Sequence, residues 1–236
     1  MKQRSPEVAP VAAAPPPVEA ERVFGPQLPV AQRYAELLVG PGVERGLVGP
    51  RETGRIWERH LLNCAVVAAA VPAGSVVFDI GSGAGLPGVA IAIVRPDLEI
   101  TLVEPLQRRF DFLVETAQVL SLPRVHVLRA RAEDVDPAGA DVVTARAVAP
   151  LARLAAWCLP LLRPGGALLA LKGARAAQEL GDAEPELRNL GASSWRIERM
   201  GLDVLEHPTT VVVVTAGDQA ARAPRATGAG AAKGRR

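Results

Sequence analysis

The sequence predicts an α/β fold in which a helical segment precedes a mostly parallel sheet. The strongest observation is the stretch 76–88, where a buried strand leads directly into alternating glycines and then an apolar helix. A second observation is that apolar strands and helical periods alternate along the chain and end in two successive strands. This order predicts a nucleotide-binding type of sheet, with its ligand at the carboxyl ends of the strands.

The same patterns divide the chain into four parts. Residues 1–22 are rich in proline and alanine and predict a disordered arm. Residues 23–73 predict a helical segment, and residues 74–217 predict the sheet with its helices. Residues 218–236 predict a disordered basic tail. Such a tail can add salt-sensitive affinity for RNA, and its candidate RNA contacts are Arg222 and Arg225. The alternative is that the tail only improves solubility.

Composition excludes several classes of protein. The net charge is +2, so overall charge indicates no particular partner. Cys64 and Cys158 lack the spacing of a disulfide framework or a zinc site, so we expect reduced thiols, no metal and a cytosolic location. The chain contains neither a secretion signal nor an apolar run of the length that predicts a membrane span.

Further strands and helices follow from periodicity and punctuation. The expected strands are 76–80, 100–104, 125–128, 141–146, 167–172, 195–200 and 209–215. The expected helices of the core include 106–120, 151–162 and 174–190. Proline lacks an N–H group, so the second should fray at Pro160 and the third should be interrupted near Pro185. A turn is expected at 163–166.

The glycine turn itself is a candidate ligand site. Gly81, Gly83 and Gly85 follow the first strand, and we expect glycine there because a Cβ would keep a ligand away from the backbone. Asp79 precedes the turn, where a carboxylate would oppose a pyrophosphate and would suit the cationic amino group of S-adenosylmethionine. The alternative is that Asp79 only caps the turn.

Three other charged residues stand at strand ends on the same edge. Glu104 follows the second strand, where a carboxylate can bind both hydroxyls of a ribose; the alternative is a helix N-terminal charge. Arg146 suits the carboxylate of S-adenosylmethionine or an RNA phosphate. The alternative for Arg146 is an ion pair on the surface. Lys172 suits a phosphate or a base of the substrate. The alternative for Lys172 is a side chain that only extends into solvent from the strand end.

The helical segment contributes further candidates. Arg55, Arg59 and His60 fall within one predicted helix and are candidate RNA contacts. The alternative for the two arginines is a solvent-exposed helix face that they share with Glu58. The alternative for His60 is a partly buried ring whose hydrogen bonds are made within the protein.

These motifs resemble one family. The stretch from Asp79 to Gly88, together with Glu104, 131–134, 144–147 and 171–173, is similar to the ribosomal small-subunit methyltransferase G family, over about residues 27–216. The resemblance implies a class I S-adenosylmethionine-dependent methyltransferase with a Rossmann-like, seven-stranded sheet. It also implies methylation of guanine N7 in small-subunit (16S) ribosomal RNA.

The resemblance also suggests roles for individual residues. It places Ala132 and Glu133 beside the adenine, with Asp134 as an alternative acceptor, and places Arg146 on the cofactor. Leu86 stands where many members have phenylalanine, which keeps an apolar contact and removes ring stacking.

Guanine N7 has a lone pair and no proton, so we expect catalysis by alignment without a general base, with Lys172 and Arg146 positioning the substrate. The expected partner is small-subunit RNA or an assembling subunit, bound by a monomer. Three alternatives remain open: a small-molecule methyltransferase on the same fold, an NAD-dependent dehydrogenase, and a non-catalytic RNA-binding module.

Overall fold

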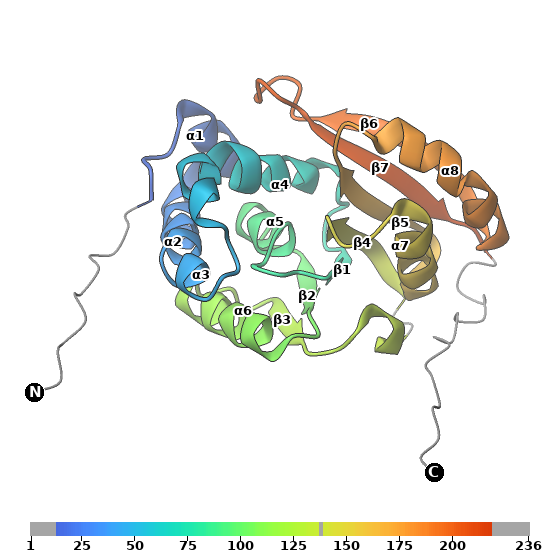
Figure 1. The fold of residues 1–236 in the computed structure, drawn as a ribbon, viewed down its shortest axis with the longest axis horizontal. Coiled ribbons are helices and arrows are strands. Elements are labelled where there is room, and N and C mark those ends of the chain that lie inside the picture. Colours follow the sequence, from blue (N-terminus) through green and yellow to red (C-terminus); the bar gives the residue numbers. More distant parts are fainter. Residues whose placement is uncertain (1–12, 137–138, 219–236) are drawn as a thin grey trace, which may run out of the picture.

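A seven-stranded sheet runs through the centre of the protein (Figure 1). The computed structural model describes residues 13–136 and 139–218. The strand order is β3-β2-β1-β4-β5-β7-β6, and β7 is antiparallel to both of its neighbours, whereas the other pairs are parallel. The strands are β1 Val76–Ile80, β2 Glu99–Val103, β3 Val125–Leu128, β4 Ala140–Arg146, β5 Leu162–Lys172, β6 Ala192–Met200 and β7 Thr209–Ala216.

Each predicted strand is therefore present, but β5 begins earlier than expected. The predicted turn at 163–166 lies within β5, and the register with β4 shifts between Ala140 and Val142 to accommodate it. Gly166 permits this close approach, because a Cβ there would lie 2.9 Å from the carbonyl oxygen of Ala140.

The α-helices of the described chain are α1 Val18–Phe24, α2 Leu28–Val39, α3 Pro41–Glu44, α4 Asn63–Ala65, α5 Gly88–Val94, α6 Gln107–Val119, α7 Leu151–Cys158 and α8 Ala176–Asn189. The short 3₁₀ and π segments are η1 Gly25–Gln27, η2 Pro50–Arg55, η3 Ile56–Leu62 (a π-helix), η4 Val66–Ala70, η5 Ala132–Asp134 and η6 Leu159–Leu161. None of the helices in the described ranges is long and apolar enough to cross a membrane.

Helices cover both faces of the sheet, as Figure 1 shows. The N-terminal helices pack with α5 and α6 on one face, and α7 and α8 pack on the other. Successive residues of the central strands alternate between these two cores: Val77 belongs to the first and Phe78 to the second. Burial on both faces explains why the strands are nearly continuous apolar runs.

Two expectations about helices are wrong. The predicted arm 1–22 is too long, because α1 begins at Val18 and buries Ala20 and Phe24. Helix α8 continues through Pro185, which is exposed while Ala183 and Leu187 on either side are buried and hold the helix against the sheet. The predicted fraying at Pro160 is confirmed, since α7 ends at Cys158 and a 3₁₀ turn follows.

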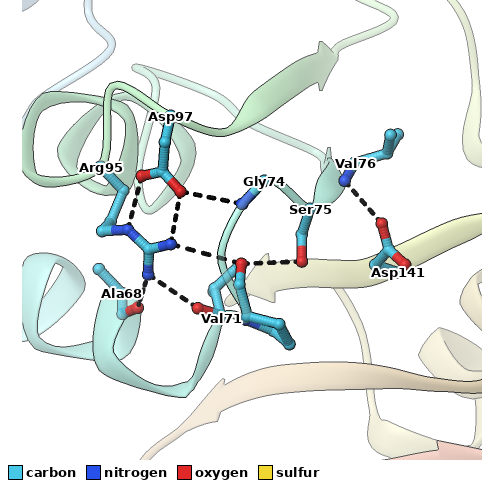
Figure 2. A network of polar contacts seen from close by, with 9 residues as sticks. Ala68, Val71, Gly74, Ser75, Val76, Arg95, Asp97 and Asp141 are labelled. Atoms are coloured by element: carbon cyan, nitrogen blue, oxygen red, sulfur yellow. Dashed lines mark hydrogen bonds and ion pairs between the residues drawn. The ribbon is translucent and has the colours of Figure 1, made fainter.

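The helical segment is joined to the amino-terminal edge of the sheet by an arginine clamp (Figure 2). Arg95 pairs with Asp97 at 2.7 Å and donates to the carbonyl oxygens of Val71 at 2.8 Å and Ala68 at 3.3 Å. Asp97 also accepts the N–H of Gly74 at 2.9 Å. This clamp fixes the end of η4 beside the starts of β1 and β2.

Candidate active site

A cavity of about 680 Å³ opens at the carboxyl ends of β1 to β4. The glycine turn after β1 forms its floor together with Glu104, and η5 and Arg146 lie on its sides. The loop 47–49 of the helical segment also lines it. This cavity is here called the first cavity. It lies where a sheet of this type binds its ligand.

A second, larger cavity of about 1360 Å³ adjoins the first. Arg146, Ala147 and Val148 line both cavities, so the two meet at the end of β4. Ala147 has a φ of +55°, a left-handed conformation that costs a non-glycine residue about 1 kcal/mol. The chain therefore turns sharply at the point where the two cavities join.

The glycines of the turn have different reasons to be glycine. A Cβ on Gly83 would meet only the carbonyl oxygen of Gly81 at 3.9 Å, so this backbone is open to the first cavity. A Cβ on Gly85 would lie 2.6 Å from Val89 and 2.8 Å from the hydroxyl of Tyr34. Gly85 therefore makes room for the protein's own side chains and is not among the residues that line the first cavity, whereas Gly81 and Gly83 line it.

Asp79 lies behind the turn. Its side chain is fully buried, accepting the hydroxyl of Thr144 at 2.8 Å and the N–H of Gly88 at 3.2 Å. It is not among the residues that line the first cavity. This geometry matches the alternative in which Asp79 caps the turn. Burial raises the pKa of Asp79 to about 6, and the hydrogen bonds from Thr144, Ser82 and Gly88 offset only part of that effect.

Glu104 lines the first cavity from the end of β2. Its side chain is 1% exposed and accepts the N–H groups of Gly83 and Leu106, both at 3.0 Å. Arg109 lies 3.6 Å away. A carboxylate has about four lone-pair positions, so two remain for hydroxyl donors of a ligand.

Arg146 is held by the helical segment. Its Nη2 donates to Nδ1 of His60 at 3.1 Å, and its Nη1 donates to the carbonyl oxygen of Arg59 at 3.3 Å. His60 Nδ1 is thus an acceptor, so the ring proton is on Nε2 and is donated to Glu52 at 3.0 Å. Burial, followed by the positive charge of Arg146, lowers the pKa of His60. His60 lines the first cavity and is satisfied internally.

Lys172 is paired within the protein. Its ammonium group donates to the carbonyl oxygen of Ala149 at 2.9 Å and to Glu179 at 2.8 Å, and the side chain is 8% exposed. The alternative of a solvated strand end is therefore wrong. Lys172 also lines the second cavity described above, so its contact with a phosphate or base of the substrate stays a prediction. The sequence pattern missed Glu179, which reaches back from α8.

The remaining predicted residues divide between the two cavities. Arg55, Arg59 and Glu58 line the second cavity, although Arg59 pairs with Glu52 at 3.7 Å. Leu86, Ala132 and Glu133 line the first, whereas Asp134 does not. Arg222 and Arg225 lie outside the described residues. Within the described ranges, no cluster of three or more His, Cys, Asp or Glu side chains could hold a metal ion.

Sequence reasoning missed part of the wall of the first cavity. Arg153 stacks over the ring of Trp157 at 4.7 Å, and both side chains line the cavity from α7. Their spacing of one helical turn is the signal that could have paired them. No local pattern marks Leu47 and Val48, because their place in the wall depends on long-range packing.

Comparisons with known proteins point to one family. A model of the family described as rRNA small subunit methyltransferase G matches residues 27–203. The "Ribosomal RNA small subunit methyltransferase G" of Thermobifida fusca is 54% identical over 226 residues, covering 92% of this chain and 95% of that protein. The protein of the same name from Salinispora tropica is also 54% identical, over 86% of this chain and 89% of its own length.

Solved structures of lower identity show the fold alone. An SAM-dependent O-methyltransferase from Thermotoga maritima has a TM-score of 0.52 at 14% identity, covering 66% of this chain and 65% of that chain. M. jannaschii TYW2 in complex with AdoMet has a TM-score of 0.52 at 16% identity, covering 68% of this chain and 76% of that chain. The predicted class I methyltransferase fold is thus confirmed. The matched residues and the close relatives show that this chain belongs to the rRNA small subunit methyltransferase G family.

Proposed function

We propose that this protein transfers the methyl group of S-adenosylmethionine to N7 of a guanine in small-subunit (16S) ribosomal RNA. The observation that carries this proposal is the meeting of two cavities at the end of β4. The first has the polar groups of a nucleoside site, and the second is larger and lined with charged side chains. Membership of the family supports ribosomal RNA of the small subunit as the acceptor.

The residues of the first cavity fit S-adenosylmethionine. Its volume of about 680 Å³ lies in the usual range for small-molecule sites. The open backbone of Gly83 allows close approach, and Glu104 has lone pairs free for the ribose hydroxyls. Ala132 and Glu133 line the same cavity, which supports the proposal that they contact the adenine. Arg146, at the junction, is a cation suited to the methionine carboxylate.

Asp79 supports this site from behind. Its carboxylate fixes the N–H of Gly88 and the hydroxyl of Thr144, so it orders the turn on which the cofactor lies.

The reaction needs alignment rather than a base. S-Adenosylmethionine, when bound, supplies a methyl group on a sulfonium, and guanine N7 offers an in-plane lone pair without a proton. The chain therefore has to hold donor and acceptor in line at near-contact distance. Arg146 faces both cavities, and Lys172 acts indirectly by holding the carbonyl of Ala149 in the wall of the second cavity.

The second cavity suits a nucleotide of a large acceptor. Its volume of about 1360 Å³ exceeds the usual range for small ligands. Arg55, Arg59 and Arg175 line it and can contact phosphates. Glu58 and Asp182 also line it. Their carboxylates are compatible with the positive charge that methylation at N7 places on the guanine ring. The acceptor is RNA, either free or within an assembling subunit, and the protein acts as a monomer in the cytosol.

The test is methyl transfer from labelled S-adenosylmethionine to small-subunit RNA that lacks this modification. We expect label in 7-methylguanosine with the wild-type protein and a loss of at least tenfold with Arg146→Ala, since a charged hydrogen-bond donor is removed. Arg188→Ala is the matched control, because Arg188 lies on α8, lines neither cavity, and among the contacts described its side chain meets Glu184 and the ring of Trp195. Label in another nucleoside, or in none, would contradict the proposal.

A further inference from the structure

A chain of three polar side chains ends at the junction of the two cavities. Arg146 donates to His60 at 3.1 Å, and His60 lies 3.0 Å from Glu52. We propose that His60, anchored by Glu52, is a positioning residue that sets the orientation of the Arg146 guanidinium for methyl transfer. This inference rests on the proposed function.

The position of Arg146 makes its orientation important. Among the residues that the structure describes, it is the charged side chain that lines both cavities. A guanidinium has five N–H donors, of which two are directed to His60 and to the carbonyl oxygen of Arg59. The buried thiol of Cys64 also lies within hydrogen-bonding reach of this guanidinium, and the other donors remain for a ligand. A long side chain at a strand end has many rotamers, so these contacts restrict which way the remaining donors point.

The contacts of His60 favour positioning over RNA binding. Both ring nitrogens are engaged within the protein, one with Arg146 and one with Glu52. The side chain is 17% exposed and lines the first cavity, whereas the charged rim for RNA belongs to the second. The ring therefore has no polar atom left for a nucleotide.

Glu52 is the fixed end of this chain. It lies in η2 and is approached by His60 at 3.0 Å and by Arg59 at 3.7 Å. Its hydrogen bond from His60 lowers the pKa of Glu52, so Glu52 stays an acceptor at neutral pH. An acceptor on this side keeps the ring proton on Nε2, which leaves Nδ1 free to accept from Arg146.

Two substitutions separate the two contacts of the ring. Asparagine places a carbonyl oxygen near the position of Nδ1, and glutamine places an amide N–H near the position of Nε2. We expect His60→Ala and His60→Gln to lower kcat/KM by about tenfold or more, because the acceptor for a charged donor is lost. His60→Asn should keep most of the activity. His126→Ala is the matched control, since His126 is exposed on β3 and pairs with Glu99.

The decisive measurement is a double-mutant cycle with Arg146→Lys. If His60 acts through Arg146, adding His60→Ala to Arg146→Lys should cause no further loss of kcat/KM. Additive losses would overturn the inference, and so would rescue by glutamine instead of asparagine. Thermal unfolding of each variant and its affinity for S-adenosylmethionine are measured alongside. A wild-type protein that methylates no RNA would overturn the proposed function, whereas full activity of His60→Ala would overturn only the role of His60.

Discussion

At the scale of single residues, burial of the Asp79 carboxyl group changes how stability depends on pH. Its pKa is about 6 in the folded protein, against an ordinary value of 3.8, because burial disfavours the charged form. The folded protein thus holds this proton more tightly than the unfolded chain. The contribution is fully present below pH 3.8 and is lost as the pH rises through about 6. The difference corresponds to about 3 kcal/mol.

Asp79→Asn removes this titration and keeps an acceptor in place. We expect the free energy of unfolding, measured in urea, to fall between pH 4 and pH 7 by about 2 kcal/mol more in the wild type than in the variant. Affinity for S-adenosylmethionine should fall in Asp79→Asn, and further in Asp79→Ala, because the turn loses its anchor. Parallel pH profiles of the two proteins would show that Asp79 ionises normally.

Lys172 has a structural pairing that predicts a loss of stability on truncation. Lys172→Ala leaves Glu179 and the carbonyl of Ala149 without their donor, so we expect the free energy of unfolding to fall by about 1–3 kcal/mol. Urea unfolding checks this, with Arg175→Ala as the control, because Arg175 lines the same second cavity. An unchanged unfolding free energy together with weaker RNA binding would instead favour a free ammonium group.

Residues at strand ends were predictable from sequence, and their partners were not. Glu104 and Arg146 follow apolar strands, so their edge of the sheet is a local inference, and the structure places both in the cavity wall. Glu179 reaches Lys172 from the next helix, and His60 reaches Arg146 across 86 positions. Such pairings depend on how elements pack, which a single sequence does not specify.

At the scale of elements, the glycine turn joins the helical segment to the sheet. The hydroxyl of Tyr34 on α2 donates to the carbonyl oxygen of Ala84 at 2.8 Å, in the space left beside Gly85. The turn therefore has an open side at Gly83 and a packed side at Gly85. This difference gives a matched pair of substitutions within one loop.

Gly85→Ala should destabilise the fold, and Gly83→Ala should weaken mainly cofactor binding. The added methyl group at Gly85 would clash with Val89 and Tyr34, at a cost of about 1–3 kcal/mol beyond the strain of its φ of +98°. At Gly83, with a φ of +59°, only the backbone strain of about 1 kcal/mol applies. Thermal unfolding and calorimetry with S-adenosylmethionine distinguish them. Equal unfolding temperatures in the two variants would contradict this division.

The types and order of elements were predictable because periodicity is local. The seven strands and the strand pair at the end follow from apolar runs and turn residues. The errors at α1 and α8 have a different source. Phe24 packs edge-on against Trp57 at 6.3 Å, and Leu187 is buried against the sheet, so tertiary packing extends helices where composition or proline predicts none.

At the scale of the whole molecule, the described structure contains both cavities, and the basic tail lies outside it. Deleting residues 219–236 removes five positive charges and should reduce RNA affinity mainly at low salt, because such contacts release counterions. Binding measured across a salt series checks this. Methylation of saturating RNA should stay unchanged. Identical affinities at every salt concentration would limit the tail to solubility.

The most direct test of the account is the nucleoside content of small-subunit ribosomal RNA, measured by mass spectrometry in cells with and without this protein. We predict the loss of one 7-methylguanosine in its absence, restored when the RNA is treated with purified protein and S-adenosylmethionine. Restoration should fail with Arg146→Ala. An unchanged nucleoside profile would leave the methyltransferase fold in place and contradict ribosomal RNA as the substrate.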